Sequence, residues 1–443
     1  MNGVRGAGPA NGRPGTGNGN GATTRRVELA YGREGLTIEV PKHAAVVRPR
    51  DVAGVGNEAA ALRAALAEPI GAAPLAELAA GKRRVVVTHS DITRATPNDR
   101  ILPVLLAALE EAGVARGDIT LINALGTHRR QTAEELRGML GADIVARYRC
   151  LQHDAWDDAG LVTAGTTRRG NAIRVNRLVM EADLVIFTGF IEPHFFAGFS
   201  GGPKGALPAL AGHESVLTNH GYAMIGDPGA TWGITEGNPI WEEMREAALL
   251  VDPLFLLNVT LNNAGEISGV FAGDVIEAHR SGCAFVRDSA MVAVDEPFDA
   301  VVTTNSGYPL DQNLYQTVKG MQAAKGIVRS GGAIIMVAGC EDGLPDHGRY
   351  AELLTEAGSP NAILKMLRQP GFSAQDQWQG QIQALIQQHA DVYVYSDGLS
   401  DAQIRAALFR PTRDIESTLA DLAPDRICVL PDGPLTIAYL NRR

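Results

Sequence analysis

RVVVTHS, residues 84–90, is a β-branched run that turns polar at its end and is followed by a longer apolar pattern. Such a short, nearly continuous apolar run is typical of a buried strand. The residues after Pro97 predict a helix, because apolar side chains recur at helical spacing, at Ile101, Val104, Leu105 and Leu109. A buried strand that leads directly into a helix is the repeating unit of a parallel α/β sheet.

The same alternation continues along the chain. DITLINALG (118–126) predicts the next strand, QTAEELRGML (131–140) the next helix and DLVIFTG (183–189) a third strand. FLLNVTLNNAGEISGVFAGD (255–274) predicts a hairpin that turns at Asn262–Gly265. We therefore expect a parallel sheet whose functional loops follow the C-terminal ends of its strands.

A second α/β series begins after a helical segment that runs from about Asp274 to Val292. Its strands are predicted at DAVVTTN (299–305), GAIIMVAG (332–339), DVYVYSD (391–397) and RICVLPD (426–432), and its helices near 311–328, 361–369, 379–389 and 401–408. The expected fold class is α/β, with two Rossmann-like α/β domains and the active site in the cleft between them. The expected boundaries are 26–273, a connecting helix at 274–295, and 296–443, whose last residues could return to the N-terminal domain.

Composition excludes several classes of function. The 443 residues are 45% hydrophobic and 20% charged, which suits a globular protein with more than one core. The net charge of −10 argues against nucleic acid or an anionic membrane as a partner, because both attract positive surfaces. No run approaches the roughly 18 apolar residues of a membrane span. The Gly/Asn-rich residues 1–25 lack the apolar core of a signal peptide and are expected to form a disordered tail.

The cysteines indicate a reducing compartment. They are scattered and form no CxxC pair, so neither a disulfide framework nor a thiolate zinc site is expected from Cys150, Cys283, Cys340 and Cys428. We expect a cytoplasmic protein.

Two polar clusters follow the first two predicted strands. HSDITRATPN (89–98) holds Asp91, Thr93 and Arg94; the first two residue types suit a cap at a helix start, whereas a cap does not need a guanidinium. In LGTHRRQTAEE (125–135), Thr132 with a glutamate three residues later predicts a capping box. His128 lies just past the strand end, where a histidine is either structural or catalytic.

A third cluster is the glycine-rich loop IEPHFFAGFSGGPKGALPALAG (191–212), which holds Lys204 and His194 and is followed by His220. Its glycines permit a positive φ, and a helix N-terminus after them would attract an anion. A Walker A loop is not indicated, because Lys204 is followed by Gly205 rather than by Ser or Thr. HExxH zinc spacing is also absent, so a metal site of another kind remains open.

The fourth cluster is NSGYPLDQNLYQTVKGMQAAKG (305–326), in which Asp311 is expected as an N-cap. Gln316 and Lys319 would share one helix face, which is either a solvated face or part of a site. Trp378, in a polar segment, is either a packing lid or a binding surface. Together the four clusters supply cations for an anion and histidines for proton transfer, which favours a small carboxylate substrate and acid–base chemistry.

Several of these motifs, in this order and spacing, resemble the nickel-dependent lactate racemase family. They are DITRATP (91–97), GTHRRQT (126–132), EPHFFAGFSGGPKGALPALAG (192–212) with TNH (218–220), and GYPLDQNLYQTVKGM (307–321). The resemblance runs from about residue 27 to near the C-terminus.

The resemblance implies a nickel-pincer nucleotide, a pyridinium-3-thioamide-5-thiocarboxylic acid mononucleotide that grips nickel. It implies covalent attachment of this cofactor to Lys204, nickel ligation by His220, and acid–base roles for His128 and His194. It places substrate-binding positions at Arg94, Gln316, Lys319, Asp91 and Trp378, and cofactor contacts at Thr93, Gly201 and Gly202. A further hypothesis is that backbone N–H groups of the SGGPKGA turn lie near the cofactor phosphate.

The implied activity is racemisation of a 2-hydroxy acid by reversible hydride transfer through a 2-keto acid, while one histidine removes the hydroxyl proton and the other restores it. The implied partners are a small 2-hydroxy carboxylate and the cofactor-biosynthesis enzymes. Alternatives are the same chemistry on a larger acid, such as gluconate or malate, and a non-catalytic nickel-cofactor carrier or sensor. A phosphate-loop kinase is disfavoured by the missing Ser or Thr.

Overall fold

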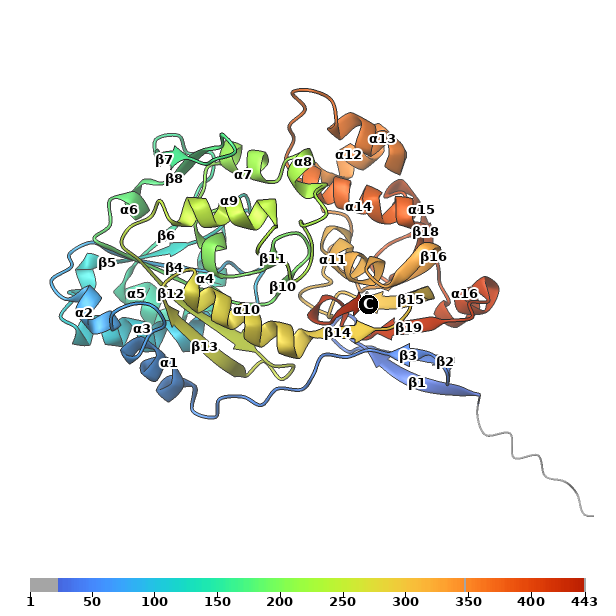
Figure 1. The fold of residues 1–443 in the computed structure, drawn as a ribbon, viewed down its shortest axis with the longest axis horizontal. Helices are drawn as coiled ribbons and strands as arrows, with labels where there is room; N and C mark the ends of the chain where they lie inside the picture. Colours follow the sequence, from blue (N-terminus) through green and yellow to red (C-terminus); the bar gives the residue numbers. More distant parts are fainter. Residues whose placement is uncertain (1–22, 346–347, 442–443) are drawn as a thin grey trace, which may run out of the picture.

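The computed structural model describes residues 23–345 and 348–441 (Figure 1). Within these residues the chain forms two halves, each built on a six-stranded sheet. The expected α/β fold with two Rossmann-like domains is therefore confirmed. Residues 1–22 of the expected tail lie outside the described part, whereas the end of that segment, Thr24 and Arg25, begins a strand.

The N-terminal sheet has the strand order β13-β12-β9-β4-β5-β6. Its strands are β4 (Val85–His89), β5 (Ile119–Asn123), β6 (Arg149–Gln152), β9 (Leu184–Phe190), β12 (Leu254–Leu261) and β13 (Ile267–Gly273). All neighbours are parallel except β12 and β13, which form the predicted hairpin. Every residue of β4 is buried, because Val85 and Val87 face one core and Val86 faces the other.

Helices and small strands cover this sheet. The helical segments are α1 (Glu58–Ala67), α2 (Leu75–Ala79), α3 (Asn98–Glu111), η1 (Arg116–Asp118), α4 (Ala133–Leu140), α5 (Ala142–Arg147), α6 (Arg177–Met180), η2 (Gly202–Gly205), α7 (His213–Asn219), α8 (Tyr222–Ile225), α9 (Pro239–Ala248) and α10 (Glu277–Ala290). The small strands are β7 (Leu161–Thr166), β8 (Ala172–Asn176), β10 (Pro193–His194) and β11 (Gly198–Phe199). The predicted capping box of α4 is present, with Thr132 and Glu135 bonding each other's backbone.

The C-terminal sheet is wholly parallel, with the order β18-β17-β16-β15-β19-β3. Its strands are β3 (Ala45–Val46), β15 (Phe298–Thr304), β16 (Val328–Val337), β17 (Ala390–Tyr395), β18 (Arg410–Pro411) and β19 (Ile427–Leu430). Its helical segments are α11 (Leu314–Lys325), α12 (Tyr350–Ala357), α13 (Pro360–Leu367), α14 (Gln377–His389), α15 (Asp401–Ala406), α16 (Ile415–Leu422) and η3 (Gly433–Leu435). Asp311 is not the N-cap of α11 as expected; Asn313 is, and the Asp311 carboxylate instead accepts from the backbone of Gly32 and Gly339, at 2.8 Å each.

The expected N-terminal boundary at residue 26 is wrong, because the first strands belong to the C-terminal half. β1 (Thr24–Leu29) and β2 (Leu36–Pro41) form a hairpin whose apolar side chains pack with those of β15, β16 and β19. β3 then pairs with β19 in the C-terminal sheet. Figure 1 shows these blue strands beside the orange and red half, away from the blue helix α1.

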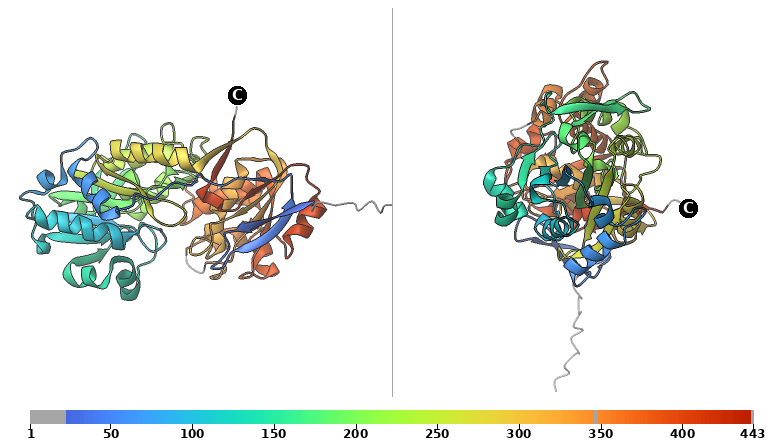
Figure 2. Two further views of the ribbon diagram at one scale, coloured as in Figure 1. Left: turned by 90° about the horizontal axis from the view of Figure 1, so that it is seen from below. Right: turned by 90° about the vertical axis from the view of Figure 1, so that its left-hand side faces the viewer.

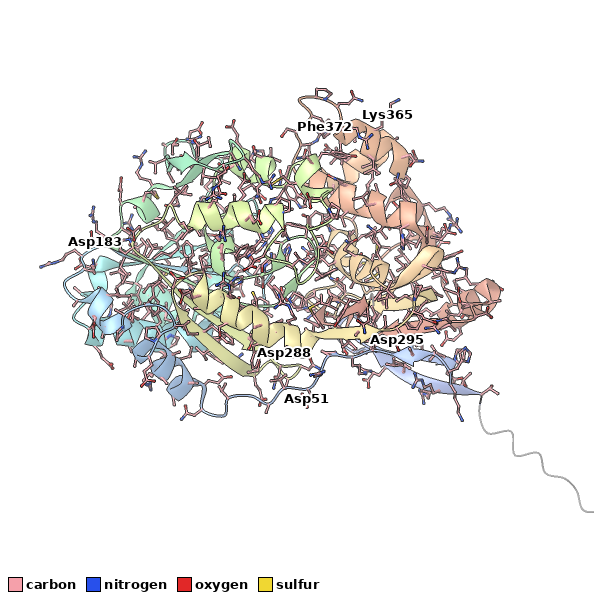
Figure 3. The ribbon with its side chains drawn as sticks, viewed as in Figure 1. Asp51, Asp183, Asp288, Asp295, Lys365 and Phe372 are labelled. Carbon is pink, nitrogen blue, oxygen red and sulfur yellow. The ribbon has the colours of Figure 1, made fainter. Side chains whose placement is uncertain are left out.

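The chain thus crosses between the halves twice. The outward crossing contains Asp51, and the return passes along α10 into β14 (Met291–Val294), which pairs in parallel with β20 (Ile437–Leu440). The two crossings touch, since the Arg50 N–H donates to the Ser289 carbonyl at 2.8 Å (Figure 3, where Asp51 and Asp288 are labelled). The last strand therefore returns to the connecting segment and does not join the N-terminal sheet.

The two halves lie side by side along the longest axis of the molecule, with α10 bridging them on one side (Figure 2). One hydrophobic cluster includes buried residues of both halves, among them Phe187, Met244, Leu314 and Trp378. None of the described helices combines the length and apolarity that crossing a membrane would require.

Candidate active site

A cavity between the halves gathers most of the predicted site residues. Loops after β4, β5 and β9 and the end of α7 supply one wall, and α11 and the start of α14 supply the other. The predicted residues that line it are Asp91, Arg94, His128, His194, Gly201, Lys204, His220, Gln316, Lys319 and Trp378. Thr93 and Gly202 do not line it. Thr93 bonds Asp91, which does.

His128 and Asp91 form a pair at the carboxyl ends of β4 and β5. The Asp91 carboxylate is 3% exposed and bonds His128 Nδ1; it also accepts from the Thr93 N–H at 3.0 Å and the Thr93 hydroxyl at 2.6 Å. Burial would raise the pKa of Asp91, but the nearby His128 and Arg94 and the hydrogen bonds outweigh burial and lower it. An ionised Asp91 can only accept, so Nδ1 of His128 carries the proton and Nε2 is left to exchange protons with a ligand.

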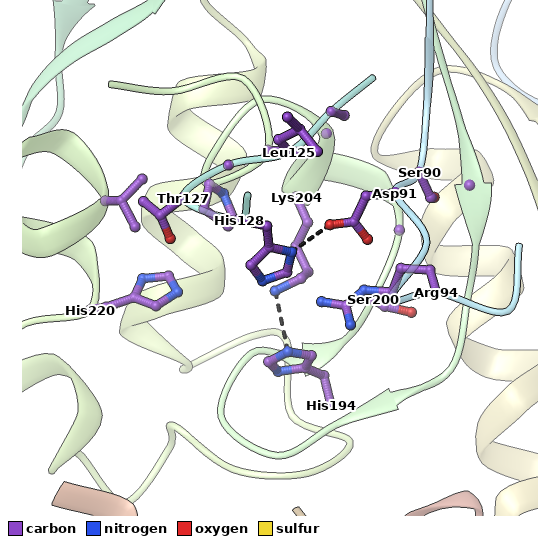
Figure 4. Close-up of a pocket in the computed structure, with 18 of the residues that line it drawn as sticks. Ser90, Asp91, Arg94, Leu125, Thr127, His128, His194, Ser200, Lys204 and His220 are labelled. Carbon is purple, nitrogen blue, oxygen red and sulfur yellow. Dashed lines mark hydrogen bonds and ion pairs between the residues drawn. The ribbon is translucent and has the colours of Figure 1, made fainter. Parts of the chain in front are cut away.

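His194 and Lys204 meet on the other side of the cavity. Lys204 Nζ lies 3.5 Å from His194 Nε2 (Figure 4), and His194 Nδ1 accepts from the Ala197 N–H at 3.2 Å. Burial, with the cations Lys204 and Arg94 nearby, lowers the pKa of His194 well below its ordinary value. His194 is therefore neutral near pH 7, and Nε2 carries its proton because Nδ1 accepts a hydrogen bond.

The Lys204 amine is unusually easy to deprotonate. Burial, followed by the repulsion of Arg94 and Lys319, lowers its pKa to about 7. A substantial neutral fraction at pH 7 makes this amine a nucleophile, which an ordinary lysine is not.

A row of rings continues from His194 across the cavity to the C-terminal half. Phe196 packs edge-on to both His194 and His220, with centroid distances of 4.5 and 4.9 Å, and His220 packs edge-on to Trp378 at 5.1 Å. Trp378 is held by a hydrogen bond from Nε1 to the Tyr315 hydroxyl at 3.2 Å. Trp378 is thus both a packing residue and part of the cavity wall.

Positive groups from both halves converge on the cavity. Lys319 Nζ donates to Gln316 Oε1 at 2.7 Å, which turns the amide nitrogen of Gln316 away from the amine. Burial and then Arg94 lower the pKa of Lys319 to about 7, whereas Glu192 and Asp91 oppose that shift. Such a cluster suits the carboxylate of a small acid, since a bound anion would relieve the repulsion between Arg94 and Lys319.

Sequence reasoning missed Glu192, a carboxylate close enough to the cluster to act on its charges. Burial raises the pKa of Glu192, and Arg94, Lys319 and Lys204 counter that rise. Its position two residues before His194, in EPHFF, was the only available signal.

The turn that carries Lys204 differs from the expectation that a helix N-terminus follows its glycines. Only the short segment η2 follows them, and the next α-helix after it, α7, begins at His213. Gly201 and Gly202 do adopt the positive φ values anticipated, 75° and 53°. The N–H of Gly202 is not free for a phosphate, because it donates to Asn258 Oδ1 at 2.7 Å.

His220 is the C-cap of α7, and the last residue of that helix, Asn219, is anchored in the core. The Asn219 amide donates to Glu243 of α9 at 2.9 Å, and Glu243 is buried and also accepts from Thr167 and Asn171. Burial, then Lys204, lowers the pKa of His220 to about 3, so its imidazole is neutral. Sequence reasoning did not find Glu243, since nothing near residue 243 relates it to His220.

The donor set fits a metal brought in by a larger cofactor. His220 Nδ1 is buried without a hydrogen-bond partner in the described structure, and a neutral imidazole is a good ligand for nickel. Among residues 23–345 and 348–441, no cluster of three His, Cys, Asp or Glu side chains could hold a metal alone. One histidine beside a nucleophilic lysine instead suits a metal whose remaining ligands belong to a tethered group.

Two family models match the chain. The lactate racemase N-terminal domain matches residues 31–233, and the lactate racemase C-terminal domain matches residues 294–437. The lactate racemase of Thermoanaerobacterium thermosaccharolyticum is 35% identical over 418 residues, which are 92% of this chain and 97% of that protein. The lactate racemase of Lactiplantibacillus plantarum is 41% identical over 345 residues, which are 77% of this chain and 80% of that protein.

Two solved structures have a fold similar to that of this chain. The lactate racemase apoprotein from T. thermosaccharolyticum superposes with a TM-score of 0.88 at 34% identity, covering 94% of this chain and 100% of that chain. A Thermotoga maritima protein superposes with a TM-score of 0.67 at 20% identity, covering 89% of this chain and 100% of that chain, and shares the fold.

Proposed function

The chain belongs to the lactate racemase family, whose members are isomerases, and from this premise we propose that it interconverts the enantiomers of lactate. The observation that carries the proposal is the convergence of His128 and His194, on separate loops, on the cavity that holds the Lys204 amine. A carrier of a nickel cofactor would need Lys204 and His220 and would have no use for two proton-exchanging histidines.

We propose that Lys204 bears the nickel-pincer nucleotide through a thioamide and that His220 ligates its nickel. When bound, this cofactor supplies a reversible hydride acceptor for the Cα–H bond of the substrate. The Lys204 amine, with a pKa of about 7, would form the C–N bond of this thioamide by attacking the carbon of an activated thiocarboxyl group during loading; the C–O bond to the leaving group would break and the sulfur would stay. The neutral imidazole of His220 has a lone pair to give. Loading would require the cofactor-biosynthesis enzymes as partners.

The two histidines are proposed to exchange the hydroxyl proton from different sides of the substrate. His128 takes or returns the proton at Nε2, because Nδ1 is committed to Asp91. The Asp91 carboxylate stabilises the imidazolium that forms, as in other carboxylate–histidine pairs. His194 exchanges its proton at Nε2, the nitrogen that faces Lys204, because Nδ1 is engaged by Ala197.

Arg94, Lys319 and Gln316 are proposed to hold the substrate. Arg94 and Lys319 bind its carboxylate, so the planar keto acid can reorient without leaving the cavity. Gln316 fixes the Lys319 amine through its carbonyl oxygen and has its amide N–H groups left for the ligand. Thr93 acts indirectly, by holding Asp91.

The cytoplasm is the proposed location, in keeping with four free cysteines, three of them buried.

Lactate is proposed as the substrate because the relatives are lactate racemases. The residues proposed to bind the substrate or exchange its proton act on the HO–C–COO⁻ unit, which gluconate and malate share with lactate.

The test is to produce the chain together with the cofactor-making enzymes and to follow both enantiomers by chiral chromatography. Starting from either pure enantiomer of lactate, the mixture should approach equal amounts of both. If the protein carries the cofactor and inverts gluconate or malate but leaves lactate unchanged, lactate is the wrong substrate and the inverted acid takes its place. One that inverts none of the three would contradict the racemase assignment.

A further inference from the structure

Two buried polar side chains clamp the turn that precedes Lys204 without reaching the cavity. They are Asn258 on β12 and His279 on the connecting helix α10. We propose that Asn258 and His279 are positioning residues that fix the aim of Lys204 for cofactor attachment. The inference rests on the proposed function, because attachment at Lys204 is part of it.

Asn258 holds the turn from the side of the sheet. Its Oδ1 accepts from the Gly202 N–H at 2.7 Å, and its Nδ2 donates to the Leu257 carbonyl at 3.1 Å. A Cβ at Gly201 would collide with this same oxygen. The backbone of the turn can therefore approach Asn258 only because residue 201 is glycine, and the positive φ there suits glycine as well.

His279 holds the turn at a second point, from α10. Its Nε2–H donates to the Ser200 carbonyl at 2.8 Å, and its ring lies where a Cβ of Gly202 would be. The ring is fully buried; it stacks on Trp241 with centroids 6.3 Å apart and lies 3.4 Å from the Cys283 sulfur. Burial lowers its pKa to about 4, so the imidazole stays neutral and His279 does not exchange protons with the site near pH 7.

The hydrogen bonds from Asn258 and His279 restrain the peptide groups of Gly202 and Ser200, which lie close to Lys204 in the chain. The Lys204 N–H donates to the Gly201 carbonyl at 3.2 Å, which links the amine-bearing residue to the clamped glycines. Its Nζ then lies 3.5 Å from His194 Nε2. A tilt of the turn would be magnified along the lysine side chain, and a displacement of about 1 Å at a reacting group can cost about 10²-fold in rate.

Burying the polar side chains of Asn258 and His279 in the core costs free energy unless their polar atoms are hydrogen-bonded. Apolar side chains of similar size would fill the same space. What they could not do is fix the orientation of the Ser200 and Gly202 peptide groups.

The test uses paired variants. His279→Leu and Asn258→Leu remove the bonds to the turn, whereas His279→Gln keeps an N–H donor and Asn258→Asp keeps the acceptor oxygen. His389→Leu is the matched control, because His389 Nε2 donates to the Val328 carbonyl at 2.9 Å in the C-terminal half. Three quantities are measured: the melting temperature, hydrogen exchange of the peptide covering 198–206, and the rate at which the Lys204 adduct forms with the cofactor-making enzymes.

Both leucine variants should melt cooperatively, exchange faster at 198–206 and form the adduct about 10²-fold more slowly. His279→Gln and Asn258→Asp should recover most of the attachment rate, and His389→Leu should attach the cofactor like the wild type. Leucine variants that attach it at the wild-type rate would overturn the positioning role alone. So would conservative variants that fail as badly as the leucine variants at equal melting temperature. A wild-type chain that acquires no adduct would overturn the attachment itself, and with it this inference.

Discussion

The Nδ1–H of His128 donates to the carboxylate of Asp91, which is buried and ionised and also accepts two bonds from Thr93. This contact joins the loops after two neighbouring parallel strands, β4 and β5. It gives His128 one free nitrogen, Nε2, and a partner of opposite charge for the imidazolium.

Replacing that carboxylate should remove the acceptor that orients the His128 ring and fixes its tautomer. Asp91→Asn keeps the shape, but the amide can donate to Nδ1 and so favour the wrong tautomer. We expect kcat for lactate racemisation to fall about 10²–10⁴-fold, the usual size of acid–base catalysis. Thr93→Val, which removes one bond to Asp91, is the graded control and should lose less. Activity of Asp91→Asn within about twofold of wild type, far short of the loss expected for acid–base catalysis, would contradict the role of this pair.

The histidines themselves should be needed for turnover and dispensable for cofactor retention. His128→Gln and His194→Gln should each lower the racemisation rate about 10²–10⁴-fold. Intact mass and nickel content should stay at wild-type levels, because neither residue is proposed to hold the cofactor. Undiminished turnover in both variants would contradict the acid–base roles proposed for His128 and His194.

The cation cluster should govern substrate binding. Lys319→Met removes a charge-assisted bond of about 1.5–3 kcal/mol, so KM for lactate should rise about 10–100-fold. Arg94→Lys retains the charge and loses the two-pronged geometry, so it should also weaken binding. Steady-state kinetics with both enantiomers decide this. A fall in kcat at unchanged KM would mean that these residues act on the chemistry rather than on the carboxylate.

The fold and most of the site could be predicted because each rests on local signals. β4 is a continuous apolar run, α4 has its capping box, and His128 immediately follows a strand. The loops after parallel strands meet at one sheet edge, so residues 91, 128 and 194 had to approach one another.

The errors involve partners that are distant in sequence. Asp311 is a residue type that often caps helices, but its carboxylate oxygen accepts hydrogen bonds from the N–H groups of Gly32 and Gly339. Only the folded chain brings these two glycines close to it. The first strands read as the start of the N-terminal domain, yet their apolar faces are buried against β15, β16 and β19, none of which begins before residue 298. The role proposed for Asn258 and His279 likewise depends on their hydrogen bonds to the turn before Lys204, which is distant from both in sequence.

In protein made without the cofactor, the titration of Lys204 should make the folding stability depend on pH. Its pKa is about 7 in the folded state against an ordinary 10.5, so between these pH values the unfolded chain binds more protons. Holding the ammonium form therefore destabilises the fold below pH 7, and the penalty fades as pH rises toward 10.5.

Lys204→Met should accordingly melt a few degrees above the wild type at pH 6, with the gap closing as the pH rises through 9. Thermal unfolding of both proteins across this range measures the gap. Lys365→Met, at a solvent-facing position labelled in Figure 3, is the control and should show no such trend. A constant gap, or a gap that widens with pH, would contradict the lowered pKa.

The central claim is that Lys204 carries a nickel cofactor that makes this chain a racemase. The most direct measurement is intact mass with nickel content, made on wild type and Lys204→Met after co-production with the cofactor-making enzymes. We expect the wild type to carry one adduct, mapped to Lys204, with one nickel, and to racemise lactate, while Lys204→Met has neither adduct nor activity. Racemisation by a wild-type chain without adduct or nickel, or an adduct on another residue, would contradict the account.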